Sequence, residues 1–320
     1  MSPRRKPILW ITDPWDTLDH ARDTTLRLAG ECLKREIPVS WCDVRSIRAE
    51  GGRIRLDAAP LLEIPHLAGP DAIRRGPTLA RMPGEFHSLH YRTDPPVDLA
   101  YLQPLQLLAL GAEKKAPLVN PARVLLMLNE KVEGQRLGHL MPPTVAASAP
   151  EPLERFGRAE GRAVLKPFHE AQSKGVELLD WRTREGAQRA RAALAAATRE
   201  YTHPVVLQRF LPGIAEGEQR LWFLDGRLLA CVRKLPKDGD FRVNIDGGSR
   251  VARTKLNRRE KAVVIRISKH LKTEKIRLAA VDLIEGLITD FNFTSPGLIV
   301  AMEEVLAIDL AAPIVRAISR

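Results

Sequence analysis

The sequence has few cysteines, few aromatic residues and no long apolar run. Its three cysteines are far apart and form no CxxC pair, which argues against a disulfide framework or a structural zinc site. No stretch approaches the roughly 20 apolar residues that a membrane-spanning helix needs. The basic N-terminus is followed by too short an apolar segment for a secretory signal. These absences favour a cytoplasmic globular protein with no membrane partner.

The chain is positively charged, with a formal net charge of +11 over 320 residues. Such a charge is compatible with an anionic partner or substrate. The basic residues are spread along the whole chain and aromatics make up only 5% of it, so a solvated Arg-rich surface is favoured over a nucleic-acid footprint. A nucleic-acid-binding protein is the alternative, and its affinity would fall steeply with salt.

The first part of the chain has the pattern of an α/β domain. Residues 7–11 are an apolar run that ends in a turn, residues 23–35 carry a helical apolar stripe, and residues 37–41 predict a second strand. This order is typical of a parallel sheet. Residues 49–83 are weakly patterned. Further along, the sequence predicts helices over 99–115 and 124–140 with a short strand at 117–121 between them.

From Arg162 the pattern changes to antiparallel strands. Short apolar runs alternate with turns, and Asp225-Gly226 between two such runs is a strong hairpin signal. Helices are predicted over 184–200 and near 258–271. A last hairpin is predicted from residues 276–284 and 287–293.

This last hairpin carries a set of oxygen ligands. In a strand, Asp290 and Asn292 point to one face while Phe291 and Phe293 point to the other. A plain two-residue loop at 285–286 would pair Asp282 with Thr289 and place Asp282 on the wrong face. We therefore expect a longer loop or a bulge that brings Asp282 opposite Asp290. Two carboxylates and an amide oxygen suit Mg²⁺, although turn capping or pairing with surface arginines would also explain them.

A second group of candidate residues is cationic. Four of the five lie at a strand end or in a Gly-rich loop, and Lys131 lies in or at the end of a turn of the predicted helix over 124–140. Fixed cations of this kind stabilise the charge of a transferring phosphoryl group, although each one alone could be a solvated surface charge. They are Lys131, Lys166, Arg220, Arg233 and Arg242.

An ordered set of short motifs resembles the prokaryotic glutathione synthetases, and the resemblance runs from about Ile8 to Ile318. A single Lys-Pro or Asp-Pro-Pro would mean little, but the ordered set is specific. The motifs are Arg92-Thr93-Asp94-Pro95-Pro96, Val119-Asn120, Asn129-Glu130-Lys131, Leu165-Lys166-Pro167, residues 208–212, residues 216–220, Arg242-Val243-Asn244 with Gly247-Gly248, and Asp282 with residues 290–296.

The resemblance implies a fold of mixed α/β and α+β class. An N-terminal Rossmann-like, pre-ATP-grasp domain (1–121) would bind substrate. A small ATP-grasp lobe (122–203) with a flap at 168–175 and a large C-terminal lobe (204–320) would hold ATP between antiparallel sheets.

The resemblance also implies roles for individual residues. ATP would be held by Lys131, Lys166, Gln208, Arg209, Phe210, Leu211 and Glu218. Phosphates and the reacting carboxylate would face Arg220, Arg233, Arg242 and Asn244. The acceptor peptide would be held by Arg92, Asp94, Thr294 and Ser295, and two Mg²⁺ ions by Asp282, Asp290 and Asn292, with Mn²⁺ as an alternative metal.

The implied reaction is the ATP-dependent joining of a dipeptide-like acid to an amino acid. The carboxylate of γ-glutamylcysteine is phosphorylated, and the amine of glycine attacks the acyl phosphate. The resemblance also implies a homodimer or homotetramer. A diverged ligase that joins another acid and amine, or a non-catalytic nucleotide-binding relative, is the alternative.

Two departures from the family pattern bear on the substrate. The family has a glycine-rich flap after Lys-Pro, whereas residues 168–175 here retain only Gly175. Close backbone approach to phosphate is therefore harder, and Ser173 and Lys174 would have to substitute. The family also has Glu where this chain has Asp290, a side chain one methylene shorter.

Overall fold

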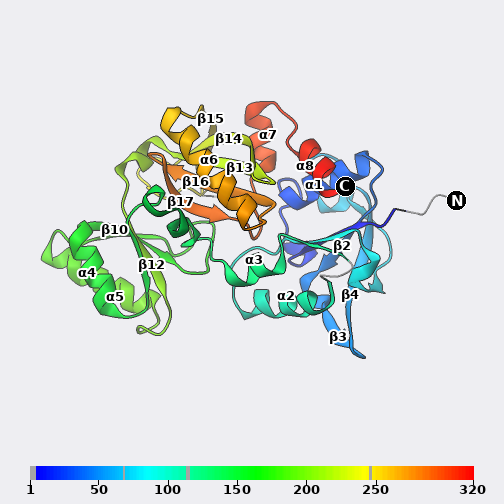
Figure 1. Cartoon of the computed structure of the whole chain (residues 1–320), viewed down its shortest axis with the longest axis horizontal. Coiled ribbons are helices and arrows are strands. Elements are labelled where there is room, and N and C mark those ends of the chain that lie inside the picture. The colour runs from blue at the N-terminus through cyan, green and yellow to red at the C-terminus, as the bar shows by residue number, and fades with distance from the viewer. Residues whose placement is uncertain (1–4, 68, 113–115, 245–246) are drawn as a thin grey trace.

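The structure is a computed structural model that describes residues 5–67, 69–112, 116–244 and 247–320. Its strands form three sheets, arranged along the chain from an N-terminal sheet to a four-stranded and then a five-stranded sheet. Figure 1 shows the N-terminal sheet and the four-stranded sheet at opposite ends of the long axis. No helix in the described part of the chain is long and apolar enough to cross a membrane.

The N-terminal sheet has a parallel centre, as predicted. β1 pairs in parallel with β2 on one side and β7 on the other, and β7 pairs in parallel with β8. Helices α1 and α2 follow the central strands β1 and β7. The elements are β1 (Ile8–Thr12), α1 (Thr24–Lys34), β2 (Val39–Asp43), β7 (Ser88–Tyr91), α2 (Leu99–Ala112) and β8 (Leu118–Val119).

The weakly patterned region contains antiparallel strands that the sequence did not predict. The longest, β4 (Arg53–Glu63), buries Ile54, Leu56 and Ala58 while arginines and acids occupy the alternate positions. This is period-2 patterning, but the short runs and the many charges obscured it. The other strands are β3 (Arg48–Glu50), β5 (Arg74–Arg75) and β6 (Leu79–Arg81).

The predicted helix over 124–140 is broken. Helix α3 (Ala122–Met127) ends before a turn at 128–132, and a 3₁₀ segment, η5 (Glu133–Leu140), follows the turn. In the turn, the Asn129 side chain accepts a hydrogen bond from the Lys131 backbone N at 2.9 Å. Side-chain bonds of this kind compete with the helical ladder, so the segment that holds Lys131 is a turn and not a helix.

The four-stranded sheet has the order β11-β10-β12-β9 and is antiparallel throughout. Helices α4 (Pro150–Glu160) and α5 (Arg184–Ala197) pack on it in one apolar core. Because β12 pairs with both β10 and β9, this sheet extends to Arg209, beyond the lobe boundary expected after residue 203. The strands are β9 (Thr144–Ala147), β10 (Arg162–Pro167), β11 (Glu177–Asp180) and β12 (Val205–Arg209).

The five-stranded sheet has the order β15-β14-β13-β16-β17. Both predicted hairpins form, and the loop residues Asp225, Gly226, Glu285 and Gly286 all have positive φ, as tight two-residue hairpins require. The elements are β13 (Glu218–Leu224), β14 (Arg227–Leu235), β15 (Arg250–Arg253), α6 (Arg258–Thr273), β16 (Leu278–Ile284), β17 (Leu287–Asn292), α7 (Ile299–Leu306) and α8 (Ala311–Ile318).

The N-terminal sheet and the five-stranded sheet share apolar cores, and the four-stranded sheet does not take part in them. One core joins Leu9 and Tyr91 of the N-terminal sheet to Phe223 and Phe293, and a second joins Trp10 to Trp222 and to the C-terminal helix α8. The four-stranded sheet keeps a core of its own, around Leu153, Leu165 and Leu194.

Substitution of Gly157 by Ala should destabilise this smaller core. A Cβ at Gly157 would overlap ring carbons of the buried Trp181, and overpacking of this kind costs about 1–3 kcal/mol. Thermal denaturation checks the effect. The control is Gly69→Ala, where a Cβ meets nothing within 4 Å; equal melting temperatures for the two variants would contradict the prediction.

Candidate active site

Two adjoining cavities lie among the three sheets. The sheet cavity, of about 870 Å³, lies between the four-stranded and five-stranded sheets, and the N-terminal cavity, of about 1230 Å³, lies beside it toward β1 and α1. Both are within or near the size range of ligand sites. They share six lining residues, which are Ala171, Gln172, Arg220, Lys234, Val243 and Asn292.

Seventeen of the eighteen predicted site residues line one or both cavities. The sheet cavity takes Lys131, Lys166, Gln208, Arg209, Phe210, Leu211, Glu218, Arg220, Arg242, Asp282, Asp290 and Asn292. The N-terminal cavity adds Arg92, Asp94, Asn244, Thr294 and Ser295. Arg233 lines neither.

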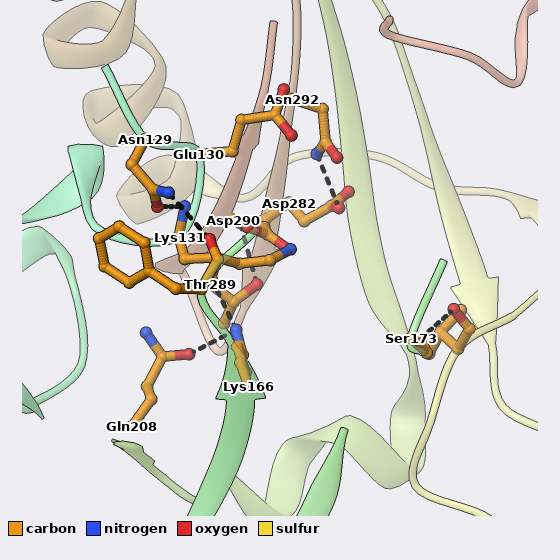
Figure 2. Close-up of polar contacts among 12 residues, drawn as sticks. Asn129, Glu130, Lys131, Lys166, Ser173, Gln208, Asp282, Thr289, Asp290 and Asn292 are labelled. Atoms are coloured by element: carbon orange, nitrogen blue, oxygen red, sulfur yellow. Dashed lines mark hydrogen bonds and ion pairs between the residues drawn. The ribbon is translucent and has the colours of Figure 1, made fainter. Parts of the chain in front are cut away.

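The carboxylate wall forms through a bulge. The loop between β16 and β17 has two residues, but the register shifts beyond Asp282, so that Leu283 pairs with Ile288 while Asp282 pairs with Asp290. The bulged residue is Thr289. Of the two arrangements expected, the bulge is therefore correct, and it places Asp282, Asp290 and Asn292 on one face of the hairpin (Figure 2).

Asp282 is a buried carboxylate that two cations neutralise. Arg220 donates to both of its oxygens, at 2.9 and 2.6 Å, and Lys234 Nζ lies 3.3 Å from Oδ2. Burial alone would raise the pKa of Asp282, but Arg220 and Lys234 outweigh burial and hold that pKa well below its usual range. The Asn292 amide also donates to Asp282, at 3.2 Å.

Asp290 has one paired oxygen and one without a partner. Lys131 Nζ donates to its Oδ2 at 2.7 Å, whereas its Oδ1 is buried and has no hydrogen-bond partner among the described residues. Buried polar atoms are nearly always paired in native structures. The unpartnered Oδ1, at an oxygen-rich wall, fits a cation. No three His, Cys, Asp or Glu side chains converge on one point in the described ranges, so such a cation would depend on Asp290, Asp282 and the Asn292 amide.

Lys166 points from β10 across to the five-stranded sheet. Its Nζ donates to Gln208 Oε1 at 2.9 Å and to the Thr289 carbonyl at 2.8 Å, as Figure 2 shows. Burial lowers the pKa of Lys166. Beside it, burial disfavours the charged form of Lys131, but the Asp290 carboxylate prevails and raises the pKa of Lys131. The two ammonium groups thus bring positive charge to the same wall.

One end of the sheet cavity is apolar. Phe210, Leu211 and Ile214 follow β12, and Phe241 lies edge-on to Phe210 at a ring-centroid separation of 6.3 Å. The Arg162 guanidinium stacks 4.2 Å from the centre of the Phe210 ring. A flat, apolar heterocycle suits such a slot. The exposed side chain of Arg209, the residue before Phe210, pairs with Glu160.

Arg233 is on the opposite face of β14, which corrects the prediction. Its guanidinium donates to the Glu216 carbonyl at 3.1 Å. The neighbouring Lys234 is only 5% exposed and lies between Glu218 and Asp282. An uninterrupted hairpin would pair Arg220 with Cys231 and put Arg233 on the site face. A bulge after Trp222 pairs Arg220 with Val232 and turns Lys234 inward instead.

The flap lies over the junction of the cavities. Ala171 and Gln172 line both cavities, and the Ser173 hydroxyl donates to the Val243 carbonyl at 3.2 Å. Gln172 and Ser173 adopt positive φ without being glycines. Lys174 lines neither cavity, so only Ser173 of the two expected substitutes reaches the site. The exposed Arg242 at the rim pairs with Asp240.

The N-terminal cavity mixes both signs of charge. Arg92 is buried, donates to Thr25 Oγ1 at 3.1 Å and to the Pro296 carbonyl at 3.0 Å, and has its pKa lowered by burial. The structure adds Asp19, Arg22 and Asp23, which the sequence did not single out. They lie in the turn before α1, and only the position of that turn beside the last strands brings them into the site.

The chain matches one protein family along nearly its whole length. Residues 7–125 match the family described as "Prokaryotic glutathione synthetase, N-terminal domain", and residues 130–307 match "Prokaryotic glutathione synthetase, ATP-grasp domain". The glutathione synthetase of Prochlorococcus marinus (strain MIT 9313) is 30% identical over 96% of each chain. That of Xylella fastidiosa (strain Temecula1) is 25% identical over 97% of this chain and 98% of the relative.

Solved structures with low sequence identity share the fold. The D-cycloserine synthetase DcsG superposes with a TM-score of 0.67 at 17% identity, over 98% of each chain. The D-alanyl-alanine synthetase A of Vibrio cholerae gives 0.62 at 12% identity, also over 98% of each chain. The sequence matches and these folds lead to one conclusion: the chain belongs to the prokaryotic glutathione synthetase family and is an ATP-grasp ligase that uses ATP and a divalent metal.

Proposed function

We propose that this ligase is a glutathione synthetase, which joins γ-glutamylcysteine to glycine at the expense of ATP. The observation that carries the proposal is the junction of two cavities at Arg220, Lys234 and Asn292. A nucleotide in the sheet cavity and a peptide acid in the N-terminal cavity would meet there. The transferring phosphoryl group would thus lie between cations and carboxylates, as phosphoryl transfer requires.

The residues take roles that follow from their positions. The apolar slot at Phe210, Leu211 and Phe241 would take adenine, and Lys131 and Lys166 would hold the phosphates. Arg220 and Lys234 would stabilise charge on the phosphoryl group and then on the tetrahedral oxyanion formed when the amine attacks. We leave Arg233 out of this set. Arg92, Asp94, Thr294, Ser295 and Asn244 would hold the acid, with Glu218, Gln208, Arg209 and Arg242 at the nucleotide side.

Asp290 and Asn292 would be the principal metal ligands, and Asp282 would join them. Asp290 Oδ1 is buried without a partner, and both oxygens of Asp282 already bond to Arg220. A bound Mg²⁺ supplies charge neutralisation to the phosphates at such a wall. Two ions, with Mn²⁺ able to replace Mg²⁺, and a homodimeric or homotetrameric state complete the proposal. Titration with each metal and light scattering test these points.

The test is product formation from defined substrates. ATP, Mg²⁺, γ-glutamylcysteine and glycine should yield glutathione, with one phosphate and one ADP per product, measured by mass spectrometry and phosphate release. Omission of glycine should reduce steady phosphate release to background. Failure to bind ATP would overturn the proposal.

A diverged ligase is the second candidate, and the flap favours it. Residues 168–174 contain no glycine, and Gln172 lines both cavities. A side chain there alters the room left for the acid and the amine. Phosphate release with a different acid–amine pair, and none with γ-glutamylcysteine and glycine, would identify this candidate.

A further inference from the structure

We infer that Glu130 is a positioning residue that holds the metal-binding strand β17 in place through its side-chain carboxylate. The inference rests on the proposed metal site at Asp290 and Asn292. Glu130 lines the N-terminal cavity next to Asn292, and the role assigned to it is to hold the backbone of β17.

Glu130 binds the free edge of β17. This strand is the last in its sheet, so one edge has no neighbouring strand in the order of the sheet. The Glu130 carbonyl accepts from Phe291 N at 3.0 Å. Its carboxylate oxygen Oε1 accepts from Phe293 N at 2.5 Å and from Thr294 N at 2.7 Å. Glu130 thus replaces a missing strand at this edge.

The Thr294 hydroxyl adds a third donor to the same oxygen, at 3.0 Å. Three donors on one carboxylate oxygen fix its position and favour its charged form, which offsets part of the effect of burial; burial still raises the pKa of Glu130. Three hydrogen bonds to the Glu130 carboxylate therefore hold the end of β17.

The alternation of the strand transmits this hold to the wall. The backbone N–H groups of Phe291 and Phe293 donate to Glu130. The alternate residues of the strand, Asp290 and Asn292, line the sheet cavity. The adjacent Lys131 pairs with the Asp290 carboxylate at 2.7 Å. The turn that contains Glu130 and Lys131 therefore contacts both the backbone of β17 and the Asp290 side chain. Figure 2 shows Glu130 next to Asn292.

The test is the metal dependence of ADP binding, measured by calorimetry with and without Mg²⁺ on the full chain. Wild type should bind ADP more tightly with Mg²⁺. The Mg²⁺ gain is the ratio of the ADP dissociation constants without and with Mg²⁺. Glu130→Ala should reduce this gain by about 10-fold or more, a loss typical of residues that orient metal ligands. Glu130→Gln should retain most of it, because the amide oxygen can still accept the three bonds.

Glu133→Gln is the matched control. Glu133 is a buried acid three residues on, more deeply buried than Glu130, and it pairs with His270 at 2.9 Å instead of with β17. It should leave the Mg²⁺ gain unchanged even if stability falls. An unchanged gain in Glu130→Ala, or an equal loss in Glu133→Gln, would overturn the inference.

If Glu130→Ala does not fold, Thr294→Val replaces it, since it removes one of the three donors. It should reduce the Mg²⁺ gain by about threefold, as loss of one hydrogen bond implies, and no change would overturn the inference. ADP binding requires neither acid nor amine. A failed substrate proposal therefore leaves this readout intact, whereas ADP binding by wild type that ignores Mg²⁺ would overturn the inference itself.

Discussion

Replacement of Asp290 by Asn should lower kcat by about 100-fold or more, the size of effect seen when one group that stabilises transferring charge is removed. The amide has nearly the same shape, so packing against Phe291 and Phe293 is retained. What is lost is the negative charge that pairs with Lys131 and would bind the metal. Steady-state kinetics at several Mg²⁺ concentrations measures the effect, and excess Mg²⁺ should restore little of the rate.

Asp180→Asn is the matched control for this change. Asp180 is partly exposed, pairs with Arg182 on the four-stranded sheet and lines neither cavity. Surface pairs contribute little, about 0–1 kcal/mol, so its kcat should equal that of wild type. Near-normal turnover by Asp290→Asn would refute the assignment of the carboxylate wall.

Lys234→Met should impair both stability and turnover. Lys234 lies between the buried carboxylates of Glu218 and Asp282. Removal of one partner of a buried ion pair costs about 3–5 kcal/mol, because an uncompensated charge remains. Burial and the neighbouring Asp282 already raise the pKa of Glu218, so this acid should be protonated more readily in the variant. Thermal denaturation and kcat are the measurements, and both should fall.

The adjacent Arg233→Met provides the comparison. Arg233 carries the same charge one residue earlier, but it lies on the other face of β14 and bonds only to the Glu216 carbonyl in the described contacts. It should keep nearly wild-type kcat. A larger loss of kcat in Arg233→Met than in Lys234→Met would contradict this assignment and support the role predicted for Arg233.

This pair of residues illustrates how far the sequence predicts the site. Apolar periodicity and turn residues were sufficient for the parallel β1–β2 pair and for both hairpins, because these signals are local. The site also depends on two bulges. A longer loop or a bulge was expected in the last hairpin, because without it Asp282 would face away from Asp290, and the structure has a bulge at Thr289. Nothing in the sequence indicated the bulge after Trp222, so the prediction named Arg233 and did not name Lys234.

Other differences have similar physical causes. The helix expected over 124–140 stops because the Asn129 side chain bonds to the backbone of Lys131, a local competition that apolar periodicity does not report. Asp19 and Arg22 reach the N-terminal cavity only through tertiary packing. In contrast, seventeen of the eighteen residues named from the family resemblance line the two cavities, because ordered motifs carry positional information that single segments lack.

The distribution of the apolar cores has a mechanical consequence. Because Trp10, Trp222 and helix α8 share one core, we expect the N-terminal domain and the five-stranded sheet to move together. The four-stranded sheet has a separate core and forms a lobe. Two short segments, near residues 141–144 and 209–212, connect this lobe to the rest of the chain. Its contacts with the rest of the chain include hydrogen bonds made by Lys166, Phe168 and Ser173. Opening of this lobe would uncover the sheet cavity and, because Ala171 and Gln172 line both cavities, would also uncover the adjoining part of the N-terminal cavity.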